Sequence, residues 1–293
     1  MLQCNMIKKA LFSLFLLLLV LVSLLETFDT HSSKQLDIAL QRSLTTFAVA
    51  RGLNGLVSVV QGTEVNISPA GMGATFTPGQ ILDPINDMVE RFSWVMLLSS
   101  VSISVQEVML HLGKTDLFKI SFTVVTLFLL LQLWIPKARE QFPLNITLKT
   151  VLLLVLLRFS VPLLVMLNEG VYDLVLAPQY EHSYEEVVKT SDEVSAMVQE
   201  VQNRERKLDE ERSFIERFNV TKQYETFKQE LRESVEAFIK RFNAAMESII
   251  SLITIFIVNS VLIPLGALWF FIYGFAYLMR QDLQVYVDGA DAL

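Results

Sequence analysis

The sequence has almost none of the residues that build disulfides and metal sites. It contains one cysteine, Cys4, and three histidines, His31, His111 and His182, which lie far apart. A single thiol excludes an intrachain disulfide and any multi-thiolate metal site. The histidines form neither an HxxxH nor an HExxH pattern. The sequence therefore predicts no metal site.

Signatures of catalysis and of nucleic-acid binding are also missing. The chain has no GxSxG, no GxGxxG, no Walker loop and no pair of catalytic carboxylates. Its 24 lysine and arginine residues are outnumbered by 31 aspartates and glutamates, and no basic block stands out. This charge pattern argues against a nucleic-acid partner. We predict a protein that is not an enzyme and that needs no cofactor.

Long apolar stretches are what the sequence has instead. Apolar residues make up 52% of the 293 residues, and the mean hydropathy is +0.45. This composition lies outside the soluble globular class. The predicted fold class is an all-α integral membrane protein with four to five membrane helices, in contact with the lipid bilayer.

The N-terminal segment has the charge arrangement of a membrane anchor. Lys8 and Lys9 precede an apolar run over residues 10–25, and no small-x-small cleavage motif follows it. We predict an uncleaved signal anchor over residues 1–25, with the N-terminus in the cytoplasm. Together with the short loops, this start suggests a bacterial inner-membrane protein.

Residues 26–91 are predicted to form a small extracytoplasmic subdomain. Apolar residues between Ser33 and Gln61 recur at spacings near three and four, which predicts an amphipathic surface helix. Between Val65 and Phe76, apolar and polar residues alternate around a proline and two glycines. That pattern predicts a short β-hairpin and hence an α/β-hairpin subdomain.

Three apolar segments are predicted within residues 92–168, after Asp83 and Pro84, which are typical of a helix start. They cover residues 92–112, 119–135 and 149–168. The first contains several serines and ionisable residues, so it either crosses the membrane or is re-entrant.

The number of membrane crossings determines on which side of the membrane the later segments lie. Five crossings place the later hydrophilic projection in the cytoplasm, and four place it outside. The positive-inside signals conflict. Lys114 and Lys119 favour five crossings, whereas four crossings are favoured by Lys137, Arg139, Lys149 and Arg280. We favour the external projection.

Arg158 is the most informative single residue, because it stands in an apolar run over 150–167 that contains no acidic residue. A charge at bilayer depth costs about 2.5 to 3.5 kcal/mol on insertion scales and needs a partner or a wet cavity. We predict that Glu107 is its counter-ion, since Glu107 also lies deep in an apolar helical segment, with Gln106 and His111 as nearby polar groups. The pair is interpreted as a polar clasp that fixes helix register, or alternatively as part of an ion pathway.

Residues 169–247 are predicted to form a helical, coiled-coil-like hairpin projection. Val187, Val194 and Val198 begin a loose heptad seam that Ser191 weakens, and the step at 219–221 is the predicted turn, with Thr221 capping the second helix. We expect homo-oligomer or protein-partner contacts through residues 183–247. A C-terminal membrane helix over 248–280 and a tail over 281–293 complete the chain.

Two hypotheses about function follow from these patterns. The first is a non-enzymatic, oligomeric scaffold or sensor whose helical arm binds partners. The alternative is a channel or transporter subunit with Glu107 and Arg158 near the pathway.

Overall fold

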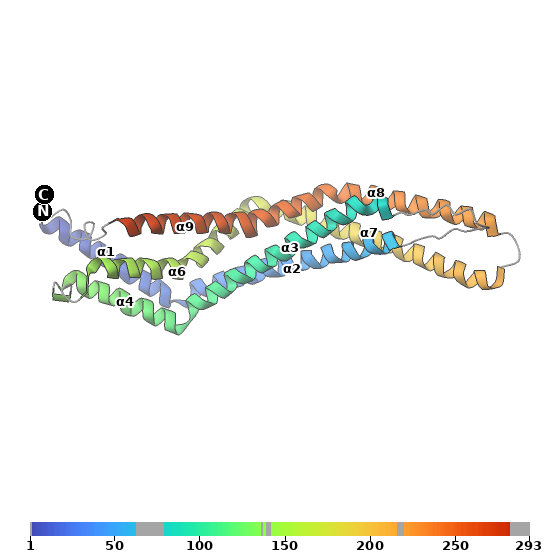
Figure 1. Cartoon of the computed structure of the whole chain (residues 1–293). Helices are drawn as coiled ribbons and strands as arrows, with labels where there is room; N and C mark the ends of the chain where they lie inside the picture. Colours follow the sequence, from blue (N-terminus) through green and yellow to red (C-terminus); the bar gives the residue numbers. More distant parts are fainter. Residues whose placement is uncertain (1, 63–78, 136, 139–141, 216–219, 282–293) are drawn as a thin grey trace. The chain divides into compact units, whose positions relative to one another are not determined.

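The chain folds into long helices (Figure 1) in a computed structural model that describes residues 2–62, 79–135, 137–138, 142–215 and 220–281. The α-helices are α1 (Leu2–Leu24), α2 (Glu26–Gly62), α3 (Gly79–Lys114), α4 (Asp116–Trp134), α6 (Leu144–Val171), α7 (Ala177–Ile215), α8 (Val220–Ile257) and α9 (Ile263–Arg280). Two short π-helices, η1 (Tyr172–Leu176) and η2 (Val258–Leu262), connect α6 to α7 and α8 to α9. The predicted all-α class is confirmed.

The predicted α/β-hairpin subdomain finds no support. The described parts of residues 26–91 are helical, and no strand occurs anywhere in the described residues. The hairpin predicted between Val65 and Phe76 lies outside them. Only the helix predicted between Ser33 and Gln61, now part of α2, is therefore confirmed.

Two predicted helix starts are wrong. Helix α3 begins at Gly79, so Asp83 and Pro84 lie inside it, and Pro84 removes a single backbone donor near the start of a long helix. Helix α8 begins at Val220, which puts Thr221 within the helix instead of at its cap. Of the predicted turn at 219–221, residue 219 lies outside the described residues, and residues 220 and 221 belong to α8.

Five of the described helical stretches are long and apolar enough to cross a membrane, and by this measure of length and composition the chain is a membrane protein. They are Thr27–Gln61, Leu82–Lys114, Asp116–Trp134, Leu144–Glu200 and Glu233–Arg280. The set includes α2, where we expected a surface helix. The helix Lys9–Leu24, which we expected to be the first span, is apolar but shorter than these five stretches.

The chain divides into two compact units. Unit 1 consists of Met1–Leu40, Val101–Asp173 and Asn259–Leu293, and unit 2 consists of Gln41–Ser100 and Leu174–Val258. The most buried charged side chain, Arg158, belongs to unit 1.

In unit 1, α1 and α6 both pack against α4, and α9 lies along α6. Buried apolar residues form successive layers along α6. The first layer contains Leu16, Leu129, Leu133, Leu144, Leu148 and Val151. The second contains Val20, Phe122 and Phe159. The third joins residues of α2, α3 and α6, namely Leu36, Ile103, Leu110, Val161 and Val165.

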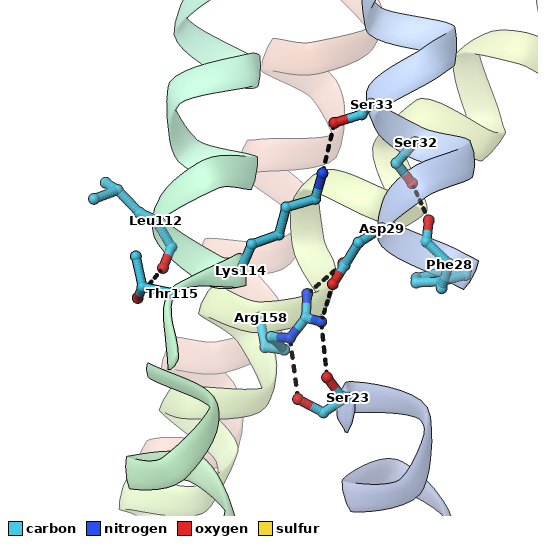
Figure 2. A network of polar contacts seen from close by, with 9 residues as sticks. All are labelled: Ser23, Phe28, Asp29, Ser32, Ser33, Leu112, Lys114, Thr115 and Arg158. Atoms are coloured by element: carbon cyan, nitrogen blue, oxygen red, sulfur yellow. Dashed lines mark hydrogen bonds and ion pairs between the residues drawn. The ribbon is translucent and has the colours of Figure 1, made fainter. Parts of the chain in front are cut away.

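Two helix breaks lie between the second and third layers, where α6 continues without interruption. Helix α1 ends at Leu24 and α2 begins at Glu26, while α3 ends at Lys114 and α4 begins at Asp116. At both breaks the next helix leads onward from the previous one and does not fold back beside it (Figures 1 and 2). Arg158 of α6 lies at the level of both breaks (Figure 2).

In unit 2, α7 and α8 pack along each other, as predicted for the hairpin. The buried residues of both helices recur at spacings of mostly three and four: Tyr180, Ser183, Val187, Thr190, Val194 and Val198 on α7, and Val235, Phe238, Phe242, Ala245, Ile249 and Leu252 on α8. The contact surface of α7 thus passes through Ser183 and Thr190, and the predicted weak position, Ser191, lies beside it. Two small polar residues fill positions that a purely apolar pattern leaves open.

Candidate functional site at Arg158

Arg158 is 1% exposed and is the largest fully buried side chain among the described residues. The apolar second and third layers of unit 1 lie on either side of it, and the Phe159 ring centroid is 5.6 Å from its guanidinium carbon. The predicted burial of this charge is confirmed.

Asp29 of α2 is the counter-ion. Nη1 of Arg158 donates to Oδ1 of Asp29 at 2.8 Å, and Nη2 donates to Oδ2 at 2.6 Å (Figure 2). The two side chains are 0% and 3% exposed. This bidentate geometry is the strongest arrangement open to an arginine and a carboxylate, and it makes the buried pair neutral overall.

Ser23 supplies the remaining contacts from the last turn of α1. The Arg158 Nε donates to the Ser23 hydroxyl at 3.0 Å, and Nη2 also donates to the Ser23 carbonyl at 3.1 Å. Carbonyls in the last turn of a helix have no partner within that helix, and the negative end of the helix dipole favours a cation there. Arg158 therefore stabilises the end of α1 and the start of α2 together.

Gly113, at the end of α3, closes the site on a third side. A Cβ placed on Gly113 would lie 3.9 Å from Nη1 and from the backbone oxygen of Arg158. This is ordinary van der Waals contact for a methyl group, so a larger side chain at Gly113 would meet the guanidinium. Pro162 has no N–H and therefore cannot bond to the Arg158 carbonyl one turn earlier.

A second set of polar contacts holds the first turns of α2. The Lys114 Nζ donates to the Ser33 hydroxyl at 2.6 Å. The Glu169 carboxylate accepts from Gln35 and lies 2.9 Å from Nε2 of His31. These contacts fasten the start of α2 to the end of α3 and to the end of α6.

The predicted pairing of Arg158 with Glu107 is wrong, because the Arg158 guanidinium forms its ion pair with Asp29. Glu107 is half-buried, and its backbone oxygen lies 2.9 Å from Nδ1 of His111. His111 is exposed, whereas Gln106 is buried. Sequence reasoning missed Asp29, Ser23 and Gly113.

One signal in the sequence pointed to Asp29. It is the second acidic residue after the apolar run of α1, and it therefore lies close to the end of that apolar helix. The sequence analysis places Asp29 in a separate external subdomain, and therefore not at the depth of Arg158.

The site joins three helices. The Arg158 guanidinium donates to both carboxylate oxygens of Asp29 and to the hydroxyl and carbonyl of Ser23. In the part of the chain that the structure describes, no group of three histidine, cysteine, aspartate or glutamate side chains is placed to hold a metal ion.

Comparison of the chain with protein-family models, with curated proteins and with solved structures finds no match.

Proposed function

We propose that the protein is a non-enzymatic, oligomeric scaffold or sensor of a bacterial inner membrane, and that its coiled-coil-like arm of α7 and α8 binds a protein partner. One observation carries this proposal. The two helices bury an apolar seam between them, and they continue through η1 and η2 into α6 and α9 without an intervening loop. A movement of the arm caused by a bound partner can therefore be transmitted to helices that are apolar enough to cross a membrane.

The outer face of the arm has the character of a protein-binding surface in water. On α7, Glu185 and Lys189 are exposed at helical spacing, while Val187 between them is fully buried. Arg241 of α8 pairs with Glu193 of α7 at 3.3 Å, so charges also flank the seam. These exposed charges favour a polar partner surface over lipid.

Photo-crosslinking tests the arm directly. A photoreactive amino acid at Glu185 or Lys189, introduced into the full chain in intact membranes, should give a crosslinked product, because both positions face outward. The same group at Val187 is the matched control and should give none. A product of about twice 33.3 kDa identifies a second copy of the chain, and another mass identifies a different protein. If neither exposed position gives a product, the arm has no partner and the proposal fails.

We further propose four membrane crossings, by α1, α4, α6 and α9. Because α4 leads onward from α3, the two helices from Val101 to Trp134 have a combined length of about 50 Å at 1.5 Å per residue. The hydrocarbon core of a bilayer is about 30 Å thick, so it accommodates α4 or the end of α3 but not both. We assign it to α4, because α4 packs with α1 and α6, which carry the chain's longest aliphatic runs.

The distribution of basic residues supports this topology. With four crossings, Lys8, Lys9, Lys137, Arg139 and Arg280 all lie on the cytoplasmic side, as the positive-inside rule requires. Lys114 favours the other topology, but its Nζ donates to a hydroxyl group on α2. This hydrogen bond gives the charge of Lys114 a structural role that does not depend on the topology.

Reporter fusions decide between the two topologies. Alkaline phosphatase inserted at residues 216–219 should be active, because four crossings place the connection between α7 and α8 outside the cytoplasm. Green fluorescent protein at the same position should stay dark, and the same protein fused after Arg280 should fluoresce. The opposite pair of results at 216–219 would contradict the four-crossing arrangement.

An exposed apolar stripe on α3 supports oligomerisation. Val101, Val105, Val108 and Leu112 are 52%, 53%, 61% and 61% exposed, and their spacings of four and three place them on one face of the helix. With four crossings this face lies beyond the hydrocarbon layer. Contiguous apolar surface in water is normally covered by another protein surface, and this spacing is that of a helix-to-helix seam.

One observation favours the second candidate function, a channel or transporter subunit. The inward face of α3 in unit 1 carries polar residues, Ser102 and Gln106, behind the exposed valines. Polar groups turned to the inside of an apolar bundle often mark ion or substrate pathways.

A further inference from the structure

The exposed apolar stripe on α3 is longer than the four residues that first mark it, and its spacing is regular throughout. Its members follow each other at intervals of four, three, four, three and four: Trp94, Leu98, Val101, Val105, Val108 and Leu112. These intervals fill positions a and d of a heptad without a gap, starting at position d with Trp94. Because α3 is one uninterrupted helix, the six side chains form a single stripe along it.

The opposite face of α3 is packed inside the chain. Met96, Ile103 and Leu110 are buried, and at 100° per residue they lie on the side of the helix away from the stripe. Polar residues, Ser104 and His111, border the stripe on one side. The stripe is therefore a narrow apolar face that no part of the chain covers among the described residues.

This face is large enough for a stable protein contact. Together with the flanking Leu97 and Met109, the stripe presents on the order of 700 Å² in each copy, close to the about 800 Å² that each partner contributes to a stable interface. The largest apolar patch on a soluble monomer is usually about 300 to 600 Å². With four crossings this face lies outside the hydrocarbon layer, so another protein surface is needed to cover it.

An identical stripe on a second copy of the chain fits this face. No aspartate, glutamate, lysine or arginine lies between Arg91 and Glu107, so two such stripes meet without like charges. All copies in a membrane have the same orientation, and a two-fold axis along the membrane normal relates a pair of them. Because α4 leads onward from α3 (Figure 2), the two α3 helices then run parallel, and each residue of the stripe meets its own counterpart.

We propose that two copies of the chain associate through a parallel, in-register coiled coil of their α3 helices along residues 94–112. The inference rests on the proposed scaffold function and its four crossings, and it specifies which surface makes the oligomer. The outer face of the arm of α7 and α8 is then available to a different protein.

Disulfide crosslinking of the full chain in native membranes tests the coiled coil. In a Cys4→Ser background, Trp94→Cys and Leu112→Cys place single thiols at the two ends of the stripe, about 27 Å apart at 1.5 Å per residue. Each variant should give, on oxidation, a product of about twice 33.3 kDa that disappears on reduction, because identical positions meet. Glu107→Cys, half-buried and outside the stripe, is the matched control and should keep the mass of one chain.

Three results would overturn the coiled coil. Neither end crosslinks to itself, or Glu107→Cys crosslinks as well as both ends, or a product forms only when Trp94→Cys and Leu112→Cys are mixed, which means an antiparallel pair. Mass measurement in detergent gives a second test that needs no thiol. Val105→Lys puts like charges into the contact and should reduce the complex to one copy, whereas Glu107→Lys should leave its mass unchanged. An unchanged mass in Val105→Lys also overturns the coiled coil.

Failure of this inference and failure of the proposed function give different results. If the ends of the stripe crosslink but the arm gives no photo-crosslinked product, the partner-binding arm is rejected and the coiled coil stands. If the arm gives a product and neither end of the stripe does, the coiled coil alone is rejected.

Discussion

Replacing Asp29 with alanine should lower the free energy of unfolding by about 3 to 5 kcal/mol, because it leaves the guanidinium of Arg158 buried without its counter-charge. The Arg158 side chain is enclosed by apolar layers and by α3, so water cannot take the place of the carboxylate without opening the bundle. The Ser23 contacts remain in this variant, but they provide only dipoles.

Two control variants separate this effect from a general loss of acidic residues. Asp37→Ala removes an exposed carboxylate from the same helix, and Glu107→Ala removes the carboxylate that we first expected to pair with Arg158. Both should change the unfolding midpoint in detergent by little. Should Asp29→Ala behave like these two controls, the buried ion pair contributes nothing and the site is misassigned.

Removing both charges should be far less harmful than removing one. In Asp29→Leu combined with Arg158→Met, no buried charge remains, and similar replacements of buried ion pairs by apolar residues are often neutral. The double variant should therefore recover most of the stability lost by Arg158→Met alone. Simple addition of the two single losses would mean that the residues do not interact.

The need for a partner could be predicted from the sequence, but its identity could not. A charge in an acid-free apolar run must find a counter-ion on another segment, and Asp29 on α2 confirms this step. Glu107 is the expected counter-ion because it lies deep in an apolar helix. This prediction is wrong because depth depends on where neighbouring helices break, and the break at Leu25 brings Asp29 to the level of Arg158.

Such breaks are hard to recognise in the sequence. Only one residue separates α1 from α2, and only Thr115 separates α3 from α4. Neither junction contains the proline or the loop of several residues that usually marks a helix boundary. Gly113 and Thr115 indicate the end of α3. The sequence around them does not indicate whether α4 continues in the same direction or turns back beside α3.

The helical arm, by contrast, was predictable because periodicity alone determines it. Val187, Val194 and Val198 are buried as expected, and so are Phe238 and Phe242. What the pattern could not show was how polar residues share the seam. Ser183 and Thr190 are small enough to be buried between the valines, and the Thr190 hydroxyl bonds to the Glu186 carbonyl of its own helix.

The second large effect is expected at Ile249 on α8, which is 0% exposed, while its neighbour Ile250 is 49% exposed. Ile249→Ala should cost about 2 to 5 kcal/mol, because it leaves a cavity in the seam. Ile250→Ala is a matched control with the same chemistry and should cost well under 1 kcal/mol, as exposed substitutions usually do. Unfolding of both variants in the same detergent gives the comparison.

The size of the Ile249 effect also bears on topology. In water, a buried isoleucine contributes its transfer from solvent together with its packing, whereas in lipid only the packing term remains, because the surroundings are equally apolar. Four crossings place this part of α8 outside the hydrocarbon layer, so the full loss is expected. A loss near 1 kcal/mol with a clear difference from Ile250→Ala would place Ile249 within lipid. Equal losses at the two positions would mean that α8 does not face α7 along this seam.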